Sequence, residues 1–93
     1  MVSAMWNGVT VATSDETIVV DGNHYFPPHS VARGCLEQSD HSSVCPVKGI
    51  ARYFHVRVGD ACNMNAAWSY PDPSTHAEAI RDHIAFWRGV EVA

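Results

Sequence analysis

Ala51-Arg52-Tyr53-Phe54-His55-Val56-Arg57-Val58 is the stretch of this chain that decides its fold class. It is rich in β-branched and aromatic residues, and alternate side chains of a strand point to opposite faces. One face carries Tyr53, His55 and Arg57, and the other carries Arg52, Phe54, Val56 and Val58. Gly59-Asp60 forms the next turn, and a second strand is expected over Asn65–Tyr70, until Pro71 stops it. The middle of the chain therefore predicts an antiparallel sheet.

In the N-terminal third, turns likewise separate short predicted strands. Val9–Val11 and Ile18–Val20 form short β-type runs on either side of a polar turn. Asp21-Gly22-Asn23 is a hairpin signal, because Gly and Asn tolerate positive φ. This turn should return the chain into the strand His24-Tyr25-Phe26, which Pro27-Pro28 ends.

Helices are expected to be short and few. One or two helical turns are predicted over His29–Leu36, and a loop over Asp40–Gly49. Thr75-His76-Ala77-Glu78 fits a capping box, so a short helix should run through Ile80. His83–Trp87 and Val90–Val92 complete the strands. The pattern indicates one domain over residues 1–93, a mainly β fold built as a small antiparallel sheet domain with one or two short helices.

Composition limits the function classes. The chain has 93 residues, 46% of them apolar, and a net charge of −4 with only six Lys and Arg. Because nucleic-acid surfaces need many cations to contact phosphates, a nucleic-acid partner is not expected. No segment reaches the roughly twenty apolar residues of a membrane span, and the N-terminus lacks the pattern of a signal peptide. A soluble cytoplasmic protein is the expectation.

The cysteines and histidines do not form a recognisable metal motif. Cys35, Cys45 and Cys62 are odd in number and include no CxxC pair, which disfavours a disulfide framework. His41 and Cys45 make one loose pair, whereas structural zinc sites present two close pairs. No Gly-rich phosphate loop or dinucleotide fingerprint is present. We therefore expect no metal and no cofactor.

The loop Cys45-Pro46-Val47-Lys48-Gly49 has the chemistry of a site. It places a thiol three residues from an ammonium, between residues that shape the backbone, and such a pair can favour a thiolate or hold an anion. Two blocks, Tyr25-Phe26-Pro27 and Trp68-Ser69-Tyr70-Pro71, place aromatic residues at strand ends. Together they predict an aromatic-lined pocket for a small polar or anionic metabolite. The candidate ligand-binding residues are Tyr25, Arg33, Cys45, Lys48, Tyr53, Trp68 and Tyr70, with Arg52 as a further cation.

Other interpretations stay open at this stage. The aromatic rings can simply fill the core, and a free cysteine is most often a buried small residue. Cys45 is also the candidate nucleophile of a cysteine-dependent enzyme, activated by Lys48 and by His41 or His55. Three Trp residues also fit a protein-interaction module, including one that self-associates.

Four ordered blocks carry a family resemblance: 21–28 (DGNHYFPP), 43–53 (SVCPVKGIARY), 66–73 (AAWSYPDP) and 84–87 (IAFW). Together they resemble the bacterial domain-of-unknown-function 427 family, over nearly the whole chain. The chain has Val47 where that family usually has Trp. The resemblance implies a small β-rich domain of the tent-like type, in which two sheets meet at an angle. The family also carries a nucleotidyltransferase-like label, but the chain lacks the carboxylate pair and Gly-Ser motif that metal-dependent transfer needs.

Overall fold

The computed structural model describes residues 1–93 as nine strands and two short 3-10 helices. All the pairings between these strands are antiparallel. The mainly β antiparallel fold predicted from the sequence is therefore confirmed. In chain order the elements are β1 (Val2–Trp6), β2 (Val9–Ser14), β3 (Ile18–Val20), β4 (Asn23–Tyr25), η1 (Pro28–Ser30), β5 (Leu36–Cys45), β6 (Gly49–Val58), β7 (Ala61–Ser69), η2 (Thr75–Ile80), β8 (Ala85–Phe86) and β9 (Glu91–Val92).

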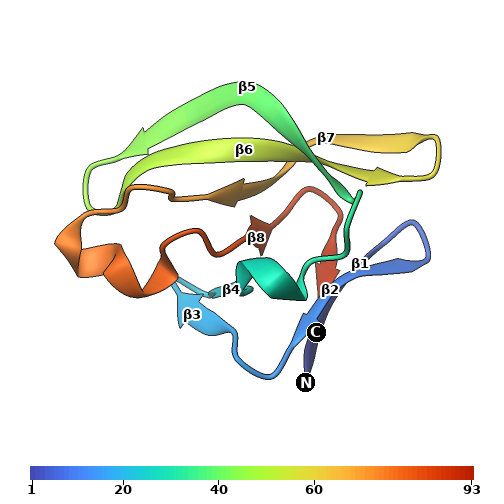
Figure 1. Ribbon diagram of the computed structural model, residues 1–93, viewed down its shortest axis with the longest axis horizontal. Helices are drawn as coiled ribbons and strands as arrows, with labels where there is room; N and C mark the ends of the chain where they lie inside the picture. The colour runs from blue at the N-terminus through green and yellow to red at the C-terminus, as the bar shows by residue number, and fades with distance from the viewer.

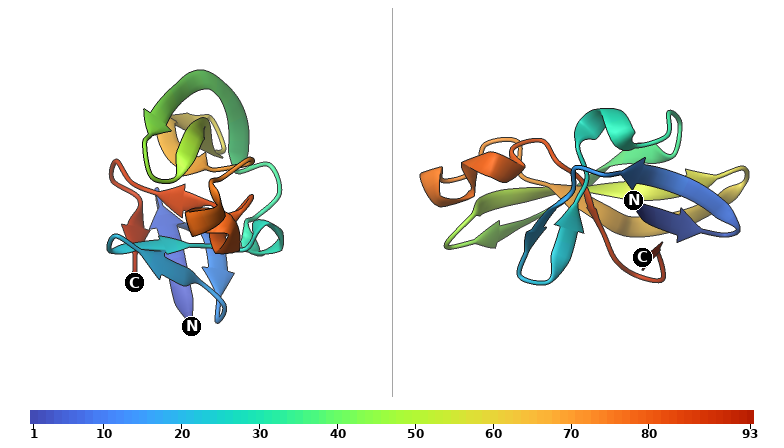
Figure 2. Two further views of the ribbon diagram at one scale, coloured as in Figure 1. Left: turned by 90° about the vertical axis from the view of Figure 1, so that its left-hand side faces the viewer. Right: turned by 90° about the horizontal axis from the view of Figure 1, so that it is seen from below.

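The strands form three sheets arranged in two layers. Figure 1 shows the four-stranded sheet, of order β5-β6-β7-β8, lying across the sheets β2-β1-β9 and β3-β4. The views in Figure 2 show the same two layers from the side and from below. The layers join just after β4, where Phe26 and Ile84 exchange two backbone hydrogen bonds of 2.7 and 2.8 Å. This junction joins the two layers at one edge.

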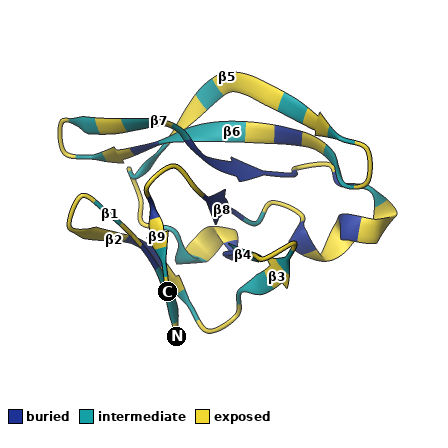
Figure 3. Cartoon of the chain, turned by 180° about the vertical axis from the view of Figure 1, so that it is seen from behind, coloured by how far each residue is buried: buried dark blue, intermediate teal, exposed yellow.

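The four-stranded sheet is buried on both faces at its centre. Tyr53, Trp68 and Ala85 lie side by side on β6, β7 and β8 and pack into one hydrophobic cluster. The next row along the same strands, Phe54, Ala67 and Phe86, packs into the other cluster. Figure 3 shows this burial in the second half of β7 and in β8. Because neighbouring rows point to opposite faces, a single sheet supplies two separate cores.

Two β-bulges bend this sheet. On β5, residues 39–41 lie opposite Tyr53 alone, and on β7, residues 64–66 lie opposite His55 alone. Asn65 adopts a left-handed φ of 55°, and Ser39 Oγ donates a hydrogen bond to Asn65 Oδ1 at 2.5 Å. Extra residues in a strand increase its local twist and bend it. The two linked bulges therefore curve the four-stranded sheet around the hydrophobic cluster that contains Tyr53 and Trp68.

The sequence prediction was wrong about the extent of two strands, β5 and β7. Residues 40–45 were expected to be loop, but strand β5 runs through Cys45. It is an edge strand with mostly exposed side chains, so it lacks the alternation that identifies a half-buried strand. Strand β7 likewise begins at Ala61, four residues earlier than expected, because its bulge breaks the period of two.

The two helical segments differ from the sequence prediction in detail. The turns expected over His29–Leu36 reduce to the 3-10 turn η1, and Leu36 begins β5. The helix expected through Ile80 is present as η2, but as a 3-10 helix without a side-chain cap. The hydroxyl of its N-cap residue, Ser74, donates instead to the carbonyl of Val47. No helix of the chain has the length and hydrophobicity that a membrane crossing requires.

Candidate functional site

The turn between β5 and β6 is held in place by the segment before η2. The Ser74 backbone N–H donates to the Lys48 carbonyl at 2.8 Å, and Ser74 Oγ donates to the Val47 carbonyl at 2.5 Å. Gly49 has a φ of +115°, and a Cβ there would lie 3.2 Å from the Asp72 carbonyl oxygen. Only glycine accommodates both the conformation and the contact. The backbone that carries Lys48 is therefore fixed at this turn.

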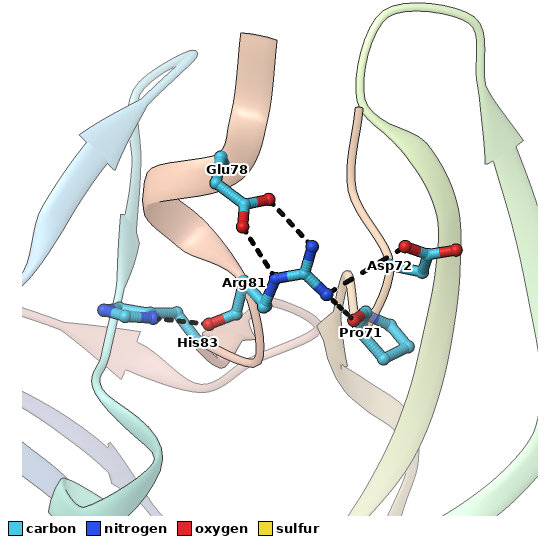
Figure 4. A network of polar contacts seen from close by, with 5 residues as sticks. All are labelled: Pro71, Asp72, Glu78, Arg81 and His83. Carbon is cyan, nitrogen blue, oxygen red and sulfur yellow. Dashed lines mark hydrogen bonds and ion pairs between the residues drawn. The ribbon is translucent and has the colours of Figure 1, made fainter. Parts of the chain in front are cut away.

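Arg81 holds in place the segment before η2, which contacts the β5–β6 turn (Figure 4). Its Nε and Nη2 each donate to the carboxylate of Glu78 at 2.9 Å, and Nη1 donates to the Pro71 carbonyl at 3.0 Å. The Asp72 carboxylate lies 3.9 Å from Nη1. A hydrogen bond from the guanidinium lowers the pKa of Glu78. Because the two-pronged geometry fixes the guanidinium plane, the C-terminal end of η2 is tied to Pro71 and Asp72, which follow β7.

Lys48 forms an ion pair with Asp21 across the two layers. Its Nζ lies 2.5 Å from Asp21 Oδ2, on the turn between β3 and β4. The Lys48 side chain is only 15% exposed, whereas that of Asp21 is 70% exposed. The hydrogen bond to Asp21 raises the pKa of Lys48, so its ammonium stays charged. Cys45 Sγ lies 3.9 Å from the same Nζ.

Five aromatic rings lie next to this ion pair. Trp68 is central: its ring centroid is 6.2 Å from that of Tyr25, 6.5 Å from that of Tyr53 and 5.8 Å from that of Trp87. Tyr25 and Tyr70 are 6.5 Å apart. Most of these rings meet edge to face or tilted, which is the arrangement that aromatic pairs favour. Trp87 is fixed by its N–H, which donates to the Asn65 carbonyl on the β7 bulge.

The rings and the ion pair line one cleft of about 200 Å³, which we call the aromatic cleft. Its lining residues are Asp21, Asn23, Tyr25, Lys48, Tyr53, Trp68, Tyr70 and Trp87. Of the seven ligand-binding residues suggested by the sequence, five meet here: Tyr25, Lys48, Tyr53, Trp68 and Tyr70. Residues from β4, from the β5–β6 turn and from the four-stranded sheet therefore converge, although they are far apart in the sequence.

The protein-family model of a domain of unknown function, DUF427, matches residues 1–93. The chain belongs to the DUF427 family. No curated protein matches it. Because the family's description states no activity, the chemistry of the DUF427 cleft must be derived from its own residues.

Two residues from the sequence prediction lie outside the cleft of this DUF427 domain. Arg33 is exposed in the turn between η1 and β5 and does not line it. Cys45 packs against the aromatic cluster near Lys48 but is not part of the lining. Arg52, the further cation, is exposed on β6. The candidate cleft residues therefore include one cation, Lys48, and not three.

Three lining residues were missed from the sequence: Asp21, Asn23 and Trp87. Asp21 and Asn23 were read only as turn formers, because their residue types already explain the hairpin. The signal that could have identified Asp21 is its negative charge in the turn before Tyr25, because Lys48 carries the opposite charge on the other candidate loop. Trp87 follows a strand without the proline that marked the other aromatic blocks, so it offered no comparable signal.

Burial and hydrogen bonds set the ionisation of this DUF427 cleft. Burial raises the pKa of Tyr70 from its ordinary 10.0 to about 12, and it also raises the pKa of Tyr25. Hydrogen bonds from the backbone amides of Lys48 and Val47 lower the pKa of the Cys45 thiol. At neutral pH the cleft therefore presents the neutral phenols of Tyr25 and Tyr70 beside the ammonium of Lys48. No three of the His, Cys, Asp and Glu side chains gather where they could share a metal ion.

Proposed function

We propose that this DUF427 domain binds a small polar or anionic metabolite in the aromatic cleft. The observation that carries the proposal is the position of Lys48, whose side chain is only 15% exposed and lines the cleft together with tyrosines and tryptophans. Lysine side chains are mostly exposed, and one held against aromatic walls places a positive charge where a ligand would bind. Of its three N–H donors, one meets Asp21 and one points to Cys45 Sγ, which leaves one for an acceptor in the cleft.

The remaining lining groups fit a ligand of this kind. Clefts for small molecules combine aromatic walls with a few polar groups that fix orientation. Trp68 and Trp87 provide flat apolar surface, while the Tyr53 and Tyr70 hydroxyls and the Asn23 amide offer hydrogen bonds. A ligand with a ring and an anionic group would use both kinds of surface.

Nuclear magnetic resonance titration with sodium benzoate tests the proposal, because benzoate combines a ring with a carboxylate. We expect the largest shifts at the indole N–H signals of Trp68 and Trp87 and at Lys48. In Lys48→Ala the affinity for benzoate should fall about tenfold or more, as expected when a charge-assisted hydrogen bond is lost. Arg33→Ala is the matched control, because Arg33 is a cation outside the cleft.

Two results would count against the proposal. Benzoate that perturbs no cleft residue removes the support for a ring-and-anion site. An unchanged affinity in Lys48→Ala removes the charge role of Lys48 and leaves only the aromatic walls.

A further inference from the structure

A second cavity also borders the Lys48–Asp21 ion pair. It has a volume of about 170 Å³, and its apolar lining comes from β3, the β5–β6 turn and η2. We call it the apolar groove. Its lining consists of His76 and six apolar residues, Ile18, Val20, Val47, Ala77, Ala79 and Ile80, besides Lys48 and Asp21. Lys48 and Asp21 line both cavities, so the ion pair is the wall that the two share.

The two cavities differ in chemistry in a way that a single ligand can match. The aromatic cleft offers rings, hydroxyls and an amide, whereas the apolar groove offers mainly aliphatic side chains. Val47 at the groove is 61% exposed, so apolar surface is available there for burial. Lys48 lines both cavities, so its ammonium is the place where an anionic group of the ligand would bind.

We infer that the ligand has three parts in order: a ring in the aromatic cleft, an anionic centre at Lys48, and a short aliphatic arm in the apolar groove. This inference rests on the proposed function and specifies the class of its ligand. N-acylated aromatic amino acids have this order of parts, since the carboxylate lies between the ring and the acyl chain. The arm must pass Asp21, whose mostly exposed side chain on a turn can move aside more easily than the clamped Lys48 backbone.

The arm has a measurable consequence. Each methylene that becomes buried contributes about 0.8 kcal/mol, which is about fourfold in affinity. N-acetyl-L-phenylalanine and N-hexanoyl-L-phenylalanine share the ring and the carboxylate and differ only in the arm. Isothermal titration calorimetry with the intact chain should show that the hexanoyl probe binds at least about tenfold more tightly.

A variant of the groove locates the arm. Ala79 is exposed and lines the groove, so Ala79→Asp places a charge there without burying it. It should remove the advantage of the hexanoyl probe over the acetyl probe. Ala32→Asp is the control, because Ala32 is an exposed alanine that lines neither cavity. It should leave both affinities unchanged.

The outcomes separate this inference from the proposed function. Equal affinities for the two probes overturn the aliphatic arm and leave the aromatic cleft as a binding site. An advantage of the hexanoyl probe that survives in Ala79→Asp also overturns it, because the arm then lies elsewhere. If neither probe binds while benzoate does, the inference fails alone, and if benzoate does not bind either, the proposed function fails with it.

Discussion

The indole N–H of Trp68 donates a hydrogen bond to the hydroxyl of Tyr25 over 3.2 Å, and both side chains are buried. Trp68 belongs to β7 in the four-stranded sheet, and Tyr25 to β4 in the layer beneath. The bond therefore joins the two layers inside the second hydrophobic cluster, at the base of the aromatic cleft.

Replacing Tyr25 by Phe tests this bond. Tyr25→Phe should lower the free energy of unfolding by about 1–3 kcal/mol, because the buried Trp68 N–H loses its partner. Urea denaturation measures the change. Tyr53→Phe is the comparison: its hydroxyl contacts Ser43 Oγ at a part-buried site that water can reach, so the loss should stay below about 1 kcal/mol. Equal losses in the two variants would show that the Trp68–Tyr25 hydrogen bond stabilises the fold no more than the Tyr53–Ser43 hydrogen bond does.

Gly49→Ala should destabilise the chain by about 1–3 kcal/mol, since it combines an unfavourable φ with a contact of 3.2 Å to the Asp72 carbonyl. Gly34→Ala separates the two causes, because Gly34 has a φ of +80° but no atom within 4 Å of the added Cβ. It should cost only the conformational strain, about 1 kcal/mol. Thermal unfolding of both variants measures the two losses of stability. A smaller loss for Gly49→Ala than for Gly34→Ala would contradict a destabilising contact between the added Cβ and the Asp72 carbonyl.

The buried tyrosines predict alkaline destabilisation. A pKa raised by folding means that the neutral phenol is favoured in the folded state, so its stabilisation is complete below pH 10 and is lost as pH rises toward 12. Tyr70 alone should reduce the free energy of unfolding by about 1.4 kcal/mol per pH unit in that range. Denaturation at several pH values should give a shallower decline for Tyr70→Phe than for the parent chain. Parallel declines would rule out Tyr70 as a source.

Cys45 should react as a thiolate at lower pH than an ordinary thiol. The backbone amides of Lys48 and Val47 are the first cause, and the Lys48 ammonium adds to them. In Lys48→Met the alkylation profile of Cys45 should move to higher pH, but only in part, since the amides remain. Pulsed iodoacetamide labelling with mass spectrometry of the Cys45 peptide resolves this thiol from the other two. Superimposable profiles would show that the ammonium, 3.9 Å from Sγ, has no effect.

The β fold could be predicted because local signals agreed with the tertiary structure. Asp21-Gly22 forms a turn with both residues at positive φ, and Ala51–Val58 lies wholly within β6. The edge strand β5 could not be predicted, because exposure on both faces removes the alternation on which such a prediction depends. The missing cap of η2 has a tertiary cause: the Ser74 hydroxyl bonds to a turn 27 residues away.

The site was predictable to the extent that its residues carried a chemical signature of their own. Lys48, Tyr25 and Tyr70 stood out by their flanking prolines and glycine, and they do converge on one cleft. The ion pair with Asp21 was not predictable, because it depends on how the β3–β4 turn meets the β5–β6 turn. Arg33 was suggested only as an assisting cation, without the preceding proline that marked the Lys48 loop, and it lies outside the cleft.

The bulge of β5 has a consequence for neighbouring molecules. An edge strand offers unpaired backbone groups to which a strand from another chain can add, and this is a route to aggregation. Residues 39–41 interrupt that row at its middle, where Ser39 is bonded to Asn65 and its hydroxyl accepts the His41 N–H. The ten-residue edge is thereby divided into two short, differently directed pieces. The bulge opposite Tyr53 thus makes this open side of the sheet a poor template for fibre growth.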